Sequence, residues 1–443
     1  MSDRFDLIIR NATAALPQGV VPADIGINGQ SIAQIGDLSG ASAENEVDAR
    51  GLHVLPGVID SQVHFREPGL EHKEDLATGT AAAALGGVTA IFEMPNTNPS
   101  TLTERDLADK VSRARGRAWC DFAFFMGCAA ENVDRLATLE RLPGCAGVKI
   151  FMGSSTGSLL VKDPEILARA LANGTRRVAI HAEDEDRLRE RAHLAKEGGH
   201  PRFHPVWRDE QTAIRATERV LFMAANARRR VHVLHITTAD EIRLLSGFKD
   251  IATVEVTPQH LTLEAPDCYE RLGALAQMNP PIRDGAHRAG LWQGVEQGIV
   301  DVIGSDHAPH TREEKARPYP GSPAGMPGVQ TLVPVMLNHV AEGRLTLERF
   351  VDLTSAGPAR IYNIARKGRI AVGYDADLTL VDLKAQREIR DADMASKCGW
   401  TPFDGKTVTG WPVRTVIRGS SVMIDDELTG KPRGEAVRFT ECL

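Results

Sequence analysis

The chain has 443 residues, of which 42% are hydrophobic and 25% charged, and its formal net charge is −7. The length suffices for one large domain and a smaller one, and the acidic balance argues against nucleic acid as the main partner. No stretch approaches the roughly 20 apolar residues of a membrane-spanning helix. Because the first residues also lack the apolar core of a secretory signal, we expect a cytoplasmic protein with no membrane partner.

Both ends of the chain contain short alternating runs that are typical of β-strands. Four such runs lie before residue 54, and similar runs recur at residues 377–382 and 412–424. Each set is too small to form a large core by itself. Because chain ends often meet at a protein surface, we predict one small β-sandwich domain formed from residues 1–55 and 366–443.

Between these ends the pattern changes to strands alternating with helices. The alanine-rich stretch from Asp75 to Leu85, for example, predicts a helix that ends at Gly86 and Gly87. Eight strands alternating with helices over about 250 residues are typical of a (β/α)₈ TIM-type barrel, which we assign to residues 56–365. The eight apolar runs are 54–65, 88–94, 119–127, 147–152, 177–181, 231–236, 251–256 and 300–305.

Chemically capable residues fall at the ends of these runs. In a (β/α)₈ barrel the carboxyl ends of the strands form the active-site face. Residues that are scattered in the sequence would therefore converge in space. The residues in question are His64, Arg66, Asn96, Lys149, His181, His235, Asp306 and His310.

Three of these residues are histidines, at positions 64, 181 and 235. For any one of them, a hydrogen-bonded histidine at the barrel rim is as good an interpretation as a metal ligand. Three on one rim favour a metal site, because imidazole is a common ligand of Zn²⁺ and Asp306 would add an oxygen ligand. Asp306 is also the best candidate for a general base, since a carboxylate beside an activated water can accept its proton.

Lys149 lies inside an otherwise apolar strand, where an unpaired ammonium group is costly to bury. One interpretation is an ion pair with a neighbouring acid, for which Asp306 is a candidate. The other is carbamylation by CO₂, which would turn the lysine into a carboxylate able to bridge two metal ions. Both remain open on the sequence.

Arg66 and Asn96 would lie on adjacent strands, where a planar guanidinium and an amide suit a substrate carboxylate. An ion pair of Arg66 with Glu67 or Glu71 is the structural alternative. Two further polar residues, Asn279 and His310, could complete the pocket, although neither stands out alone.

Together these motifs resemble those of the cyclic amidohydrolases, and of dihydroorotases most closely. The resemblance covers nearly the whole chain, and its motifs occur in the family's order. They are Gly-Val-Ile-Asp-Ser-Gln-Val-His-Phe-Arg-Glu-Pro-Gly, Glu-Met-Pro-Asn-Thr-Asn-Pro, Gly-Val-Lys-Ile-Phe-Met-Gly, Ile-His-Ala-Glu, Leu-His-Ile-Thr, Met-Asn-Pro-Pro-Ile-Arg and Gly-Ser-Asp-His-Ala-Pro-His.

The resemblance implies opening of a cyclic amide, with roles for individual residues. Asp306 falls on the general acid/base position. Arginine at position 66 favours dihydroorotate over hydantoin or allantoin, whose rings present no carboxylate there. The metal-ligand positions correspond to His64, Lys149 as a carboxylated lysine, His181, His235 and Asp306, and the dihydroorotate-binding positions to Arg66, Asn96, Asn279 and His310.

Gln62 departs from the pattern, because the family has histidine at this position. An amide oxygen is a much poorer ligand than imidazole for a transition metal. We therefore predict one firmly held Zn²⁺, with Lys149, His181 and His235 as its ligands, and a second site weakened by Gln62.

Three functions remain open at this stage. The first is a dihydroorotase, and the second is a cyclic amidohydrolase acting on a hydantoin- or allantoin-like ring. The third is a catalytically silent relative that scaffolds aspartate transcarbamoylase, since such relatives lose metal ligands. We expect a homo-oligomer, and two segments rich in proline, glycine and charge, 201–207 and 311–327, are substrate lids or simple loops.

Overall fold

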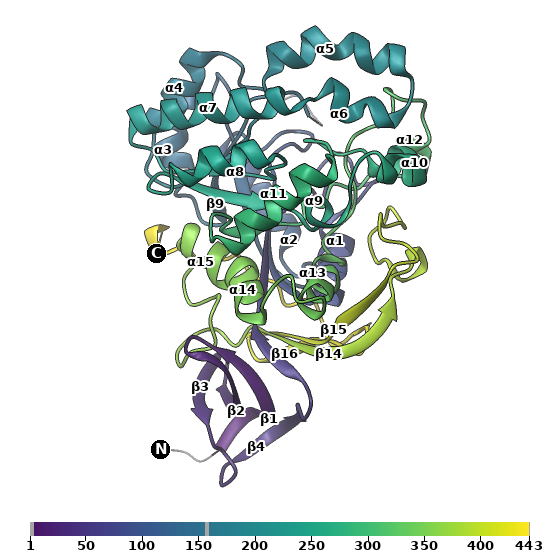
Figure 1. The fold of residues 1–443 in the computed structure, drawn as a ribbon. Coiled ribbons are helices and arrows are strands. Elements are labelled where there is room, and N and C mark those ends of the chain that lie inside the picture. Colours follow the sequence, from purple (N-terminus) through teal and green to yellow (C-terminus); the bar gives the residue numbers. More distant parts are fainter. Residues whose placement is uncertain (1–3, 156–158, 443) are drawn as a thin grey trace.

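A computed structural model describes residues 4–155 and 159–442. Eight parallel strands follow one another in chain order and form one sheet, which helices surround (Figure 1). A backbone hydrogen bond of 2.7 Å from His64 N to His307 O joins the first strand to the segment after the last. The predicted (β/α)₈ barrel is therefore confirmed. Its strands are β6 (Val58–Val63), β7 (Val88–Glu93), β8 (Asp121–Gly127), β9 (Cys145–Phe151), β10 (Val178–His181), β11 (Val231–Val233), β12 (Ala252–Val256) and β13 (Val302–Ile303).

The helices begin and end where local sequence signals direct them. The first starts after Asp75, whose side chain accepts a hydrogen bond from Thr78 N, and ends at Gly86. No helix in the described ranges is long and apolar enough to cross a membrane. The helices are α1 (Leu76–Leu85), α2 (Glu104–Ala114), α3 (Leu136–Leu139), α4 (Pro164–Ala172), α5 (Glu185–Gly198), α6 (His204–Trp207), α7 (Glu210–Ala227), α8 (Ala239–Ser246), α9 (Pro258–Thr262), α10 (Asp267–Leu272), α11 (Gly285–Glu296), α12 (Arg312–Lys315), α13 (Leu332–Ala341), α14 (Leu347–Val351) and α15 (Gly357–Ile361).

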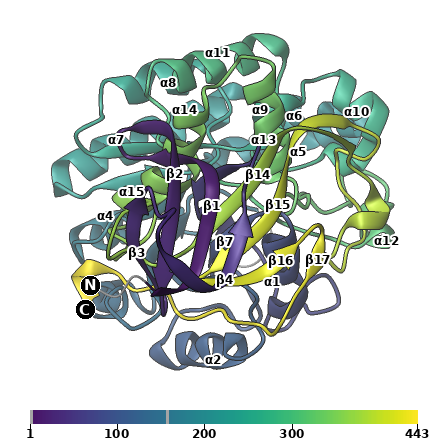
Figure 2. The same cartoon turned by 90° about the horizontal axis from the view of Figure 1, so that it is seen from below.

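The two ends of the chain form one separate β unit, as the sequence predicts, and its nine strands belong to a single sheet. They share this one sheet because the short strand β5 pairs with β1 on one side and with β14 on the other. Figure 2 shows the sheet lying across the lower end of the barrel. The domain boundaries themselves stay a prediction. The strands are β1 (Arg4–Leu16), β2 (Gly19–Asn28), β3 (Ser31–Gly36), β4 (Ser42–Asp48), β5 (His53–Pro56), β14 (Leu378–Glu388), β15 (Thr407–Ile417), β16 (Ser420–Ile424) and β17 (Glu427–Leu428).

The apolar run 54–65 is divided between the two sheets at Gly57. The Gly57 amide donates to Asp377 O at 2.8 Å. A Cβ atom at this position would lie 2.2 Å from Thr89 Oγ1 and 2.9 Å from Asp377 Cβ. Only glycine fits at the point where the chain passes from one sheet to the other. The apolar run is therefore divided at Gly57 into two strands, one in each sheet.

The interior of the barrel is closed at its lower end by aromatic rings. Phe92 packs edge-on against Tyr362 and Phe439, with ring centroids 5.4 Å and 5.7 Å apart. All three are buried, and burying each apolar ring contributes roughly 1.5–3 kcal/mol to stability. These rings therefore form part of the apolar core inside the barrel.

Candidate active site

The carboxyl ends of the barrel strands surround a narrow cavity of about 20 Å³. The structure brings eight of the nine residues proposed from the sequence into its lining, together with Gln62. They are His64, Arg66, Asn96, Lys149, His181, His235, Asn279 and Asp306. The ninth, His310, is fully buried behind Arg66, with its Nε2 3.3 Å from Arg66 Nη2.

Three of the residues at this rim have left-handed backbone conformations. Their φ angles are 65° for Arg66, 38° for His235 and 46° for Asp306. A non-glycine residue in this region costs on the order of 1–3 kcal/mol and persists only where its surroundings hold it. Directing these three side chains into the cavity therefore costs the folded state some stability.

His181 and His235 face each other from β10 and the end of β11. Their Nδ1 and Nε2 atoms lie 3.0 Å apart. The Nε2–H of His181 donates to Glu183 at 2.9 Å, so the lone pair of His181 Nδ1 points toward His235. This spacing is compatible with both nitrogens binding one Zn²⁺ at about 2.0–2.1 Å.

The charge of Glu183 stabilises the arrangement in which His181 and His235 face each other. Burial alone would raise the pKa of Glu183, but Arg208 and His181 outweigh it and hold the pKa well below its usual range. Burial lowers the pKa of both His181 and His235. The two imidazoles are therefore neutral, which is the form that binds metal ions.

On the opposite side of the cavity, His64 Nε2 lies 3.3 Å from Asp306 Oδ1. His64 Nδ1 is 2.8 Å from Asn96 Oδ1, which can only accept, so this nitrogen carries the proton. The lone pair of Nε2 then faces the carboxylate, an arrangement that a cation would stabilise. The same carboxylate oxygen accepts a hydrogen bond of 3.1 Å from Gln62 Nε2, while Gln62 Oε1 is buried and has no hydrogen-bond partner among the residues that the structure describes.

Lys149 lies between these two pairs and is 1% exposed. Its Nζ is 4.5 Å from the centre of the Phe151 ring. Across residues 4–155 and 159–442 it forms no ion pair, so the predicted alternative of a salt bridge with Asp306 is not observed. Burial lowers the pKa of Lys149 to about 7, which makes a substantial fraction of it a neutral amine at physiological pH.

These residues fit a metal ion, although in an unusual combination. Within the described residues, no group of three or more His, Cys, Asp or Glu side chains is placed to hold a metal. The structure instead offers two pairs, His181 with His235 and His64 with Asp306, and Lys149 is the side chain between them. A carboxylated Lys149 would complete a three-ligand set with His181 and His235.

Arg66 is 1% exposed, and its Nε donates to Pro309 O at 3.2 Å. It has no carboxylate within ion-pair distance among the described residues, so the predicted alternative of a pair with Glu67 or Glu71 is not observed. Glu67 instead pairs with Arg117 at 2.8 Å. A buried guanidinium without an anionic partner can bind a carboxylate group in a bidentate contact.

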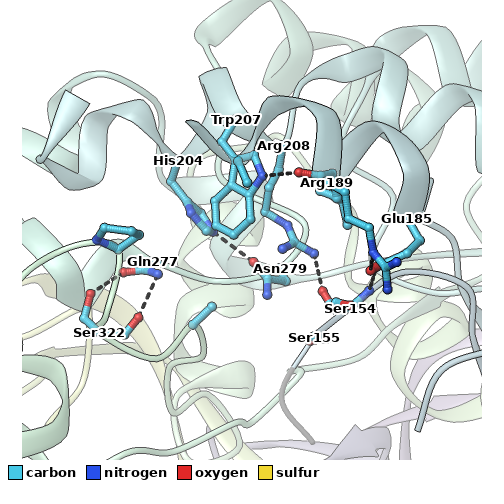
Figure 3. Close-up of a pocket in the computed structure, with 14 residues that line it drawn as sticks. Ser154, Ser155, Glu185, Arg189, His204, Trp207, Arg208, Gln277, Asn279 and Ser322 are labelled. Carbon is cyan, nitrogen blue, oxygen red and sulfur yellow. Dashed lines mark hydrogen bonds and ion pairs between the residues drawn. The ribbon is translucent and has the colours of Figure 1, made fainter. Parts of the chain in front are cut away.

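The narrow cavity adjoins a wider pocket of about 300 Å³ (Figure 3). The two share Ser155, Asn279 and Ala324 in their linings. Asn279 Oδ1 accepts a hydrogen bond of 2.9 Å from His204 Nε2. Residues of both segments predicted to be lids or loops, 201–207 and 311–327, line this wider pocket. It has the size of a small-molecule site, so a ring that reaches the residues of the narrow cavity would extend past the shared residues into the wider pocket.

The sequence analysis assigned no role to Glu183 or Arg208, which are both buried beside His181. Glu183 carries a usable signal, because it follows His181 by two residues in the motif Ile-His-Ala-Glu, just past the end of β10. Arg208 carries none, since it reaches Glu183 from a segment 25 residues away.

Comparison with known proteins agrees with the geometry of this site. Residues 53–422 match the amidohydrolase family. The chain belongs to this family. Amidohydrolases are generally metal-dependent hydrolases, which agrees with the paired ligands at the strand ends.

Individual relatives cover almost the full length of this amidohydrolase. It is 36% identical over 446 residues to a dihydroorotase from Methanosarcina acetivorans, across 97% of this chain and 95% of the relative. It is 34% identical over 450 residues to an allantoinase from Solibacter usitatus, across 98% and 97%. The solved L-hydantoinase from Arthrobacter aurescens superposes with a TM-score of 0.93 at 29% identity, across 98% and 99%.

Proposed function

We propose that this amidohydrolase is a dihydroorotase, which interconverts dihydroorotate and N-carbamoyl-aspartate in pyrimidine biosynthesis. The similarity to dihydroorotases over nearly the full chain supports this function. The observation that carries the choice of substrate is Arg66, a buried cation that lines the cavity without an ion-pair partner among the described residues. Dihydroorotate supplies the carboxylate that such a cation requires.

The side chains suggest how the ring would be held. Arg66 would bind the substrate carboxylate. His310 lies behind Arg66 and is held by other partners, because its Nδ1 accepts from Lys73 Nζ at 3.1 Å and its Nε2–H donates to Ala324 O at 3.0 Å. With this tautomer His310 contacts Arg66 by packing and not by a hydrogen bond. Burial lowers the pKa of His310 to about 3, so this imidazole is neutral. Asn96 and Asn279 lie in the same lining and would orient the ring amide.

Asp306 would move the proton during ring opening. Water adds to the ring carbonyl carbon, the carbon–nitrogen bond breaks, and the proton lost by water passes through the Asp306 carboxylate to the leaving nitrogen. A bound divalent metal would lower the pKa of water toward about 7 and polarise the ring carbonyl. The Gln62 amide keeps the Asp306 carboxylate in place by its hydrogen bond.

We infer that the metal is Zn²⁺ and that Lys149, as a CO₂-derived carbamate, is one of its ligands together with His181 and His235. The burial of Lys149 and its lowered pKa favour the neutral amine that reacts with CO₂. A second ion beside His64 and Asp306 would be weakly held, because Gln62 presents an N–H donor to that site and not a lone pair.

A hydantoinase- or allantoinase-like activity is the second candidate. The wider pocket beside the cavity favours it, since about 300 Å³ would accommodate a ring substituent that dihydroorotate lacks. A catalytically silent partner of aspartate transcarbamoylase is the third. A scaffold has no need of a buried lysine or of an unpaired buried arginine, so the site argues for an enzyme.

One experiment separates these three functions. The zinc- and bicarbonate-supplemented protein is incubated with dihydroorotate, hydantoin and allantoin, and ring opening is followed by absorbance. We expect turnover of dihydroorotate and little of the other two. Turnover of hydantoin or allantoin in preference to dihydroorotate would refute the dihydroorotase assignment, and no turnover of any ring would support the scaffold.

A further inference from the structure

Arg208 is a buried arginine that substrate binding does not explain. It follows α6 and forms part of the wall of the wider pocket between Trp207 and Asn279 (Figure 3). Its side chain is 3% exposed. Its side chain forms strong interactions with Glu183 and Ser154, which lie just after β10 and β9.

The first interaction is a two-point contact with Glu183. Arg208 Nε donates to Glu183 Oε1 at 3.0 Å, and Nη2 donates to Oε2 at 2.5 Å. Glu183 is fully buried and accepts the Nε2–H of His181. The planar guanidinium thus fixes the carboxylate, which in turn fixes the tautomer and orientation of the imidazole.

The second interaction reaches the strand that carries Lys149. Arg208 Nη2 donates to Ser154 O at 2.7 Å, and Ser154 lies just after β9. The backbone of Arg208 is itself held by Arg283, whose Nη1 donates to Arg208 O at 3.1 Å. Arg283 Nε also donates at 2.8 Å to Thr237 Oγ1, two residues after His235.

We propose that Arg208 is a positioning residue for the metal site. Through Glu183 and Ser154 its side chain connects the ends of β10 and β9, and so presets the geometry of His181 and Lys149 before a metal arrives. The link to β11 runs through the Arg208 backbone carbonyl and Arg283, and side-chain substitution leaves that carbonyl in place. This role rests on the proposed metal-dependent function, but it concerns metal affinity and not the identity of the substrate.

The test measures zinc affinity by competition with a chromophoric chelator at neutral pH, without substrate. We expect Arg208→Met to weaken zinc binding by about 10- to 100-fold, as loss of an outer-shell partner does. Arg208→Lys should recover part of this loss, because it keeps the charge but not the two-point contact. The matched control is Arg189→Met, which removes another arginine from the same pocket but one that pairs with Glu185 and not with Glu183.

Thermal unfolding of the metal-free variants separates positioning from folding. A folded Arg208→Met protein that binds zinc within about twofold of wild type would overturn the proposal. If Arg208→Met does not fold, Glu183→Gln replaces it, since the amide keeps the size but loses the charge, and unchanged zinc affinity there would also overturn the proposal. A protein with this pattern of zinc affinities but no activity on dihydroorotate would refute the proposed function alone.

Discussion

The two sides of the active site are built differently. On the β10–β11 side, His181 and His235 face each other, and a buried Glu183–Arg208 pair fixes the proton of His181. On the β6–β13 side, His64 and Asp306 face each other, and their neighbour Gln62 donates a hydrogen bond where a further metal ligand would be required. Under the proposed function, metal binding and carboxylate-assisted proton transfer would be divided between the two sides.

The largest effect is expected from removing a ligand on the β10–β11 side. His235→Ala should reduce kcat/KM by about 10³-fold or more, because the loss of a metal's transition-state stabilisation corresponds to several kcal/mol and each 1.36 kcal/mol is tenfold. Metal analysis of the purified variant should show a parallel loss of zinc. If His235→Ala keeps zinc and activity, this side does not hold the metal.

Arg66→Met should lower kcat/KM for dihydroorotate by about 10²- to 10³-fold, since truncating one partner of a buried charge pair costs about 2–5 kcal/mol. Any residual activity on hydantoin should change by less than about threefold, because that ring presents no carboxylate. Steady-state kinetics on both rings provide the measurement. An equal loss on both rings would mean that Arg66 has a structural role.

The pH dependence should follow Lys149, whose pKa is lowered by burial to about 7. Below this pH the ammonium form predominates and does not react with CO₂. Incorporation of zinc into metal-free protein in bicarbonate should therefore fall up to tenfold for each pH unit below 7 and level off above it. Incorporation independent of both pH and bicarbonate would show that Lys149 is not carbamylated.

The smallest effect is expected in the wider pocket. Trp207→Ala should change KM for dihydroorotate by about twofold or less, because Trp207 lines the wider pocket and not the narrow cavity. A larger change for dihydroorotate, measured by initial rates, would place the substrate ring against Trp207.

Much of the fold and of the site could be predicted from the sequence, because both depend on local patterns. The apolar runs predicted the eight barrel strands. The barrel geometry then predicted that residues as distant in sequence as His64 and Asp306 lie close together. The division at Gly57 could not be predicted, since it depends on contacts with Thr89 and Asp377 far along the chain.

The contacts that support the site residues could not be predicted from the sequence either. Arg208 acts through Glu183 and Ser154, and His310 through Arg66, so their environments exist only in the folded chain. Asn96, for example, which is predicted beside Arg66 on the adjacent strand, accepts a hydrogen bond from His64. Such pairings follow from side-chain geometry, which no spacing in the sequence encodes.

The most direct test of the difference between the two sides is the metal content of the protein purified without added zinc, measured by mass spectrometry for wild type and Gln62→His. We predict about one tightly held equivalent per chain in wild type and a second in Gln62→His, because imidazole restores a lone pair beside His64 and Asp306. Two tightly held equivalents in the wild-type protein would contradict the proposed asymmetry.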